Sequence, residues 1–190
     1  MKLLLIVDMI NGFLKEGNMA FASGMAVVDP ILELATNFVA KDYDIAAFRD
    51  EHAPDSLEFR TYPTHCLKGS SESELIDELK IFDNKIIDIP KASTNGVNTQ
   101  AFQALLKEKS YEESVVVGVC SDICVLQSVL SLITQFYEHN IDTKVSVATD
   151  AIATFDNSEH NANDYHNFAI DLMRNASANI SDSKTIINQK

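Results

Sequence analysis

Three side chains with the chemistry of an activated nucleophile each follow a short apolar stretch: Asp8, Lys91 and Cys124. An ordinary thiol, with a pKa of ~8.5, needs assistance to ionise at neutral pH. A lysine can stabilise the thiolate and a carboxylate can take its proton. Cys124 also begins an apolar helical pattern, and a helix N-terminus supplies positive potential and free N–H groups. This combination indicates a cysteine nucleophile, with the amides of the turn from Cys120 to Cys124 available to bind an oxyanion.

A second group of polar residues has the composition of a metal site. Asp50 and His52 are two positions apart, which places both side chains on the same side of an extended segment. With Glu58 and His65 from the residues that follow, they form a nitrogen and oxygen ligand set suited to zinc, iron or manganese. Spacing alone leaves open the alternative of a polar loop whose histidines cap backbone groups.

Each of these residues also has a purely structural interpretation. Lys91 alone could be a solvated side chain, and Cys124 alone could be a core residue of an apolar helix. Asp150 could cap a helix or join the other carboxylates. His160 and His166 are expected on the exposed side of a late helix, as structural or solvated residues.

The sequence around these residues alternates short apolar runs with longer helical patterns. Strands are expected at residues 3–7, 45–48, 85–89, 114–119, 144–148 and 178–180, with Pro90 ending the third. Helices are expected at residues 27–40, 73–80, 98–109, 124–139 and 158–175. This alternation predicts one α/β domain over residues 1–190, a Rossmann-like three-layer sandwich. Its sheet should be six-stranded and mainly parallel, with helices on both faces.

This architecture explains how residues distant in the sequence can meet. Parallel strands end at one edge of the sheet, where ligands bind in doubly wound folds. Asp8, Asp50, Lys91, Cys120 and Asp150 follow the first five strands and are expected to converge there. The irregular stretch at residues 50–71 is long for a compact domain and is expected to be a functional loop.

Composition narrows the class of partner. The 190 residues include 15 Lys and Arg against 28 Asp and Glu, a formal net charge of −13, and no basic patch is visible. Binding to nucleic acid or to a membrane is therefore not expected. No stretch approaches the ~20 apolar residues of a membrane span, and the first apolar run is too short for a signal peptide. The odd number of cysteines, with Cys66 expected to be buried, predicts a reducing, cytoplasmic location.

Three segments resemble the isochorismatase-like cysteine hydrolases, in that family's order and at its spacing: residues 6–13 (IVDMINGF), 91–95 (KASTN) and 118–125 (GVCSDICV). The third is the most specific, because it marks the nucleophile. Within the superfamily, the chain is similar to the nicotinamidases, which carry an Asp-x-His followed by Pro-x-His-Cys. Here these motifs are residues 50–52 and 63–66. A glutamate seven residues before the second histidine, used by some nicotinamidases, is present as Glu58.

The resemblance implies a catalytic role for three residues. Asp8 would take the thiol proton and later activate water, Lys91 would stabilise the charged site, and Cys124 would attack the carboxamide carbon to form a thioester. The amides of Cys120 and Cys124 would form the oxyanion hole. A cis peptide bond is expected between Val119 and Cys120.

The resemblance also implies a substrate and a cofactor. The substrate would be a small amide, nicotinamide, hydrolysed to nicotinate and ammonia in NAD salvage, with Phe13, Val119 and Cys120 in contact with it. One divalent ion, zinc or alternatively iron or manganese, would hold the pyridine nitrogen. The implied metal ligands are Asp50, His52, Glu58 and His65. A homo-oligomer, dimeric or tetrameric, is expected.

The chain departs from the family pattern at two positions. Glu51 stands where many nicotinamidases have an aromatic residue, so the aromatic wall is expected from Phe21 or Tyr62. Cys120 stands where the family often has alanine. Two other functions remain open: hydrolysis of another small amide, such as a carbamoyl or ureido compound, independently of His52 and His65, and a non-catalytic binding or assembly role.

Overall fold

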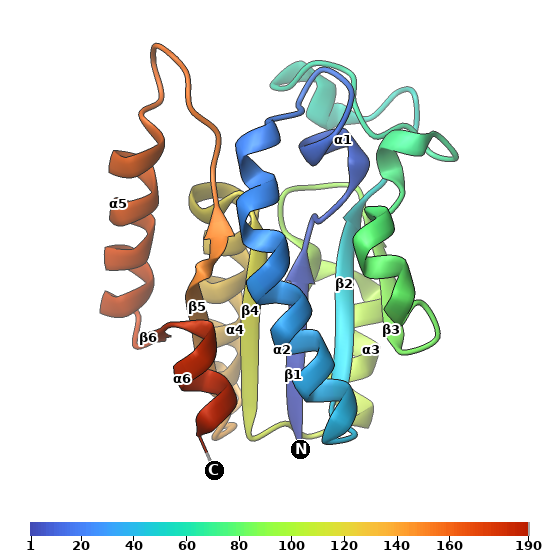
Figure 1. The fold of residues 1–190 in the computed structure, drawn as a ribbon. Helices are drawn as coiled ribbons and strands as arrows, with labels where there is room; N and C mark the ends of the chain where they lie inside the picture. Colours follow the sequence, from blue (N-terminus) through green and yellow to red (C-terminus); the bar gives the residue numbers. More distant parts are fainter. Residues whose placement is uncertain (190) are drawn as a thin grey trace.

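A computed structural model describes residues 1–189 and contains one six-stranded sheet (Figure 1). All strand pairings are parallel, and the strand order is β3-β2-β1-β4-β5-β6. The strands are β1 (Lys2–Val7), β2 (Asp44–Asp50), β3 (Ile86–Lys91), β4 (Glu113–Val119), β5 (Lys144–Ala153) and β6 (Asn179–Ser181). The prediction of a six-stranded α/β sheet is confirmed.

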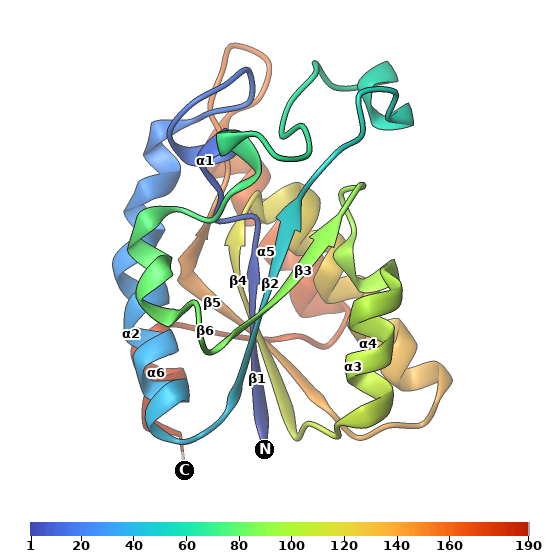
Figure 2. The same ribbon diagram turned by 90° about the vertical axis from the view of Figure 1, so that its right-hand side faces the viewer.

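Helices cover both faces of this sheet. Helices α2 (Val28–Ala40) and α6 (Ser183–Asn188) lie on one face, and α3 (Gln100–Glu108), α4 (Leu126–Glu138) and α5 (Ala162–Asn175) lie on the other (Figures 1 and 2). The short helix α1 (Asn11–Leu14) lies beyond the carboxyl end of β1 (Figure 1). None of the helices in the described part of the chain combines the length and apolar character that crossing a bilayer requires.

A hydrophobic core lies on each face of the sheet, between the strands and the helices that cover that face. Successive side chains of a strand point to opposite faces. In β1, Leu4 and Ile6 therefore pack into the core beneath α2, whereas Leu3 and Leu5 pack into the core beneath α3 and α4. All four are fully buried, which explains why this strand reads as a continuous apolar run rather than an alternating one.

The prediction of a helix at residues 73–80 is wrong. The segment instead contains two short 3-10 helices, Ser71–Ser73 and Asp77–Phe82. Between them the backbone is paired with the residues that follow β1: Asn11 N donates to Glu74 O, and Ile76 N donates to Met9 O. This long-range pairing overrides the local helical pattern.

Other boundaries also differ from the prediction. Pro90 does not end the third strand, because β3 is an edge strand and tolerates a residue without an N–H. The last long helix begins at Ala162 rather than residue 158, because the Asn161 side chain caps it by accepting from Asp164 N at 3.1 Å. Strand β5 continues past residue 148 to Ala153.

The strand order reverses between β1 and β4, which creates the crevice where doubly wound sheets bind ligands. Gly118 allows these strands to approach closely: it has φ of +115°, and a Cβ there would lie 2.0 Å from Val7 O. The crevice lies beside Asp8 and the turn that follows β4.

Candidate active site

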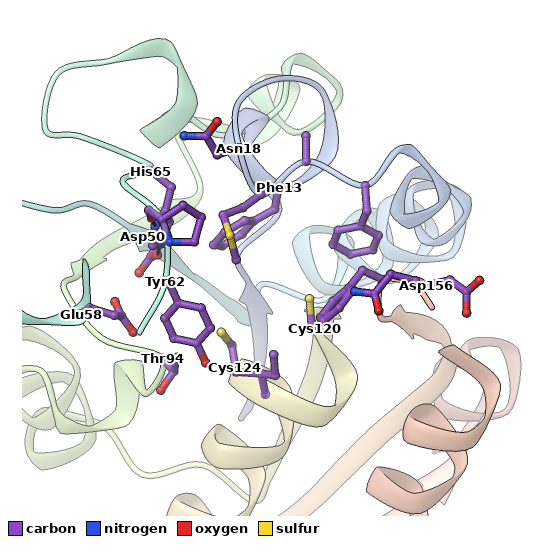
Figure 3. Close-up of a pocket in the computed structure, with 17 residues that line it drawn as sticks. Phe13, Asn18, Asp50, Glu58, Tyr62, His65, Thr94, Cys120, Cys124 and Asp156 are labelled. Atoms are coloured by element: carbon purple, nitrogen blue, oxygen red, sulfur yellow. Dashed lines mark hydrogen bonds and ion pairs between the residues drawn. The ribbon is translucent and has the colours of Figure 1, made fainter. Parts of the chain in front are cut away.

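The ends of four strands bring the predicted polar residues together, and Figure 3 shows two of them, Asp50 and Cys120. Asp8 follows β1 directly, in the left-handed region at φ 53°, and its N–H donates to Phe48 O at 3.0 Å. Asp50 and Lys91 are the last residues of β2 and β3, and Cys120 follows β4. The backbone geometry at the end of each strand therefore aims these side chains into one site.

The expectation that Asp150 joins them is wrong. Because β5 extends to Ala153, Asp150 lies within the strand and not after it. Its carboxylate accepts from Ser183 N at 2.7 Å and from Ser183 Oγ at 2.6 Å, so it anchors the first residue of α6. Its role is structural.

Lys91 links two buried carboxylates. Its Nζ lies 2.9 Å from Asp8 Oδ2 and 2.8 Å from Asp50 Oδ1, and all three side chains are buried. Burial would raise the pKa of Asp50, but the Lys91 ammonium and hydrogen bonds from His52 and His65 hold it well below its usual value. Burial disfavours the Lys91 ammonium, yet the surrounding negative charges keep its pKa well above its usual value. Lys91 is therefore charged and Asp50 is a carboxylate.

Asp8 is the carboxyl group suited to exchange a proton. Burial raises its pKa to about 6, while Lys91 opposes the increase. Burial also raises the pKa of the Cys124 thiol well above its usual value, although Lys91 again opposes this. The thiol is thus protonated in the resting site. Asp8, which is ionised at neutral pH, is the neighbouring group able to accept its proton.

Cys124 lies in a π-helical turn, Ser121–Val125, that leads into α4. The carbonyl of Cys120 accepts from the amides of Ile123 and Val125, both at 3.1 Å, which closes the turn. The Val119–Cys120 peptide bond is cis, as the resemblance implied. Burial raises the pKa of Cys120 to about 12, so this second thiol, like that of Cys124, is protonated in the resting site.

The four predicted metal ligands form one cluster. One ligand atom each from Asp50, His52, Glu58 and His65 lies within 4.8 Å of the others. Asp50 Oδ2 lies 2.9 Å from His52 Nε2 and 3.0 Å from His65 Nε2. His52 Nε2 lies 3.1 Å from Glu58 Oε2. Asp50 is the last residue of β2, while His52, Glu58 and His65 come from the irregular segment that follows it.

The arrangement of donors and acceptors fits a bound cation. His65 Nδ1 lies 2.7 Å from Pro63 O, which can only accept, so Nδ1 donates. Nε2, 3.0 Å from Asp50 Oδ2, is then the ring nitrogen that can give up its proton and bind a metal ion. Glu58 Oε2 is buried, and although His52 Nε2 lies 3.1 Å away, it has no partner with hydrogen-bond geometry among the described residues. A divalent ion among these atoms would satisfy them all, and two nitrogens with two carboxylates suit zinc, iron or manganese.

A cavity of about 370 Å³ connects this cluster with Cys124. Figure 3 shows His65, Asp50 and Glu58 on one side, and Cys120 and Cys124 at the other. Aromatic and apolar side chains form most of its walls. They are Phe13, Met19, Phe21, Tyr62, Ile123 and Phe155.

The predicted substrate contacts lie in different positions. Phe13 and Cys120 line the cavity, whereas Val119 is fully buried in the core behind it. Both candidates for the aromatic wall, Phe21 and Tyr62, are present in it. Glu51 is directed away from the cavity toward Arg49, with 3.1 Å between its Oε2 and Arg49 Nη1. The absence of an aromatic residue at position 51 therefore does not leave the cavity wall open.

Comparison with known proteins agrees with this geometry. Residues 2–185 match the model of the Isochorismatase domain. The chain belongs to the isochorismatase family. It is 34% identical to nicotinamidase 1 of Arabidopsis thaliana over 179 residues, which are 85% of this chain and 72% of that protein.

Solved structures share the fold of this isochorismatase-family hydrolase. N-carbamoylsarcosine amidase of Thermoplasma acidophilum has a TM-score of 0.80 at 23% identity, over 96% of each chain. The pyrazinamidase of Pyrococcus horikoshii in complex with zinc has a TM-score of 0.77 at 20% identity, over 95% of this chain and 98% of that one.

Of the structural and solvated roles that the sequence left open for His160 and His166, the structure shows the structural one. His160 lies before α5 rather than on it, and its ring is stacked between two aromatic rings. His166 is only partly exposed, and its Nδ1 lies 3.1 Å from Ser121 Oγ. Neither is simply solvated. The hydrogen-bonding partners Asp122 of His160 and Ser121 of His166 lie 38 and 45 residues earlier, so no local pattern indicated these two contacts.

Proposed function

We propose that the protein is a metal-dependent nicotinamidase that hydrolyses nicotinamide to nicotinate and ammonia and so serves NAD salvage. The observation that carries this proposal is the single cavity that joins the nucleophile to a four-ligand cluster across aromatic walls. Such a cavity matches a flat ring with an amide at one end and a ligand nitrogen at the other. The likeness to the Arabidopsis nicotinamidase supports the same substrate.

Asp8, Cys124 and Lys91 have separate roles in the acylation step. Asp8 accepts the proton of the Cys124 thiol, and the sulfur attacks the carboxamide carbon. The amides of Cys120 and Cys124 stabilise the oxyanion of the tetrahedral intermediate. Asp8 then gives its proton to the departing nitrogen, so that ammonia leaves and a thioester remains on Cys124. Lys91 stays charged throughout and stabilises the carboxylate form of Asp8.

Hydrolysis of the thioester returns the site to its starting state. Asp8 takes a proton from water, the resulting hydroxide adds to the thioester carbon, and the sulfur leaves as the proton returns to it. Nicotinate and the free thiol are the products. When bound, the metal ion would supply a Lewis-acid contact for the ring nitrogen, held by Asp50, His52, Glu58 and His65.

The charge of the cavity argues against a substrate that carries its own carboxylate. Among residues 1–189 no arginine or lysine lines the cavity, whereas Asp50, Glu58 and Asp156 do. A carbamoyl amino acid would therefore find no cationic side chain for its carboxylate, and would have to rely on the proposed metal ion instead. A neutral aromatic amide such as nicotinamide meets no such penalty.

The test is ammonia release from nicotinamide by the purified protein, before and after chelation and again after adding zinc or manganese. We expect release that is lost on chelation and restored by metal, and none from Cys124→Ala protein that retains its circular dichroism spectrum. Absence of release from metal-replete wild-type protein, with turnover of a carbamoyl compound instead, would overturn the proposed substrate. Turnover by the Cys124→Ala variant would overturn the mechanism.

A further inference from the structure

The segment between β5 and α5, residues 154–161, connects the wall of the cavity with the turn that carries the nucleophile. Phe155, Asp156 and Asn157 from this segment line the cavity. In Figure 1 the segment rises above the carboxyl end of β5 before the chain descends into α5. Nothing in the reaction scheme above uses the histidine at its far end, His160.

The ring of His160 is held on both faces and at both nitrogens. It stacks on Phe155 with 3.9 Å between ring centroids and on Tyr165 with 3.8 Å. Its Nδ1 lies 3.0 Å from Phe155 O, and its Nε2 lies 2.8 Å from Asp122 Oδ2. The ring therefore contacts the carbonyl of Phe155 with one nitrogen and the side chain of Asp122 with the other. Through these two contacts His160 joins the cavity wall to Asp122.

Asp122 belongs to the turn that matters most for catalysis. It lies between Cys120 and Cys124, whose amides are assigned to the oxyanion hole. The His160 and Asp122 side chains are only 11% and 10% exposed. Asp122 Oδ1 is buried without a hydrogen-bond partner among the residues described. The other oxygen, Oδ2, is the one that His160 contacts. Removing that donor leaves a nearly buried carboxylate unpaired in the middle of the turn.

A second histidine reinforces the same turn. His166, from α5, approaches the neighbouring Ser121 Oγ at 3.1 Å with its Nδ1. Two consecutive residues of the turn, Ser121 and Asp122, are thus fixed by side chains from one region of the chain. An oxyanion hole works only when its donors are placed in advance, and misplacement by about 1 Å can cost about 100-fold in rate.

We propose that His160 is a positioning residue of this enzyme: through Asp122 it fixes the turn that carries Cys124 and the oxyanion-hole amides, and through Phe155 it fixes the adjoining cavity wall. The catalytic part of this proposal depends on the proposed amidase function. The structural part, the fastening of the turn, does not.

The test compares His160→Gln with a matched histidine change, His139→Gln, at the exposed end of α4. Kinetics are measured well below the melting temperature, so that only folded protein contributes. We expect kcat to fall 10- to 100-fold in the His160 variant and to stay within twofold of wild type in the control. If kcat in folded His160→Gln is also within twofold of wild type, a merely structural role is shown and the proposal is overturned.

A double-mutant cycle with Asp122→Asn tests whether His160 acts through Asp122. We expect the double variant to lose little more than His160→Gln alone, because the second change removes a partner that is already lost. Losses that multiply would overturn the coupling. Should His160→Gln fail to fold, Asp122→Asn alone keeps the side-chain shape and is expected to give a smaller decrease in kcat of the same kind.

Hydrogen exchange provides a measurement that needs no substrate. We expect peptides covering residues 119–126 to exchange at least tenfold faster in His160→Gln than in wild type, and unchanged in His139→Gln. Unchanged exchange in His160→Gln would overturn the proposal even if the enzyme proved to hydrolyse another amide. Conversely, faster exchange in a protein inactive on nicotinamide would reject the proposed substrate but retain the fastening of the turn.

Discussion

Replacing Lys91 by methionine tests the central electrostatic feature of the site. The change keeps most of the side-chain volume but removes the charge between Asp8 and Asp50. At 2.8 and 2.9 Å, each contact corresponds to about 6 kcal/mol of Coulomb attraction at an effective dielectric constant of about 20. Desolvation of the ammonium offsets much of this attraction. Breaking a buried pair by removing one partner typically costs about 3–5 kcal/mol of stability, which we expect here.

The chain offers a matched control at Lys109. Its Nζ lies 2.7 Å from Asp44 Oδ2, but its side chain is 40% exposed, against 1% for Lys91. Lys109→Met should therefore cost about 0–1 kcal/mol, since water replaces the lost contact.

The assay is urea unfolding of metal-free protein at pH 7.5, followed by circular dichroism. A loss in Lys91→Met no larger than that in Lys109→Met would refute the reasoning. The deficit of Lys91→Met should also shrink at pH 5, because protonation of Asp8 relieves the repulsion between the two carboxylates left behind.

Three further predictions follow from other parts of the structure. Because burial raises the pKa of Asp8 to about 6, the fraction of its carboxylate form increases as the pH rises through 6. We therefore expect kcat/KM to rise about tenfold per pH unit below pH 6 and to level off above it. A flat profile from pH 4.5 to 8 would contradict the role of Asp8 as base. His65→Ala should reduce zinc content measured by mass spectrometry at least tenfold, whereas His139→Ala should not. Gly118→Ala should prevent stable folding, because the added Cβ would lie 2.0 Å from a backbone oxygen. Gly69 also has a positive φ but has open space around it, so Gly69→Ala should lower the free energy of unfolding in urea by only about 1–2 kcal/mol.

The proposed catalytic residues were accessible from the sequence because the ends of strands define their positions. Asp8, Asp50 and Lys91 occupy equivalent places at the carboxyl edge of three adjacent strands, so recognising the strands was enough to group them. The metal ligands were accessible for a related reason: all four come from β2 and the segment immediately after it. Asp150 shows the limit of this reasoning. An error in the end of one strand moved that residue out of the site.

The cavity walls could not be predicted in the same way. They combine residues 18–21, 62–63 and 155–157, which come from three irregular segments placed by packing rather than by strand register. The helix predicted at residues 73–80 failed for the same physical reason. Its backbone groups found partners in Met9 and Asn11, a contact that no local propensity contains.

The two parts of the site place different demands on the chain. The proposed nucleophile, a thiol that burial keeps protonated, requires a neighbouring carboxylate able to accept its proton, and burial raises the pKa of Asp8 to about 6. The cluster around Asp50 requires a carboxylate that stays ionised despite burial, which a neighbouring cation supplies. Lys91 meets both demands because it contacts Asp8 and Asp50 at once from the end of β3. Moving β3 relative to β1 and β2 would therefore disturb both sites together, which explains why the ammonium is carried by a strand rather than by a loop.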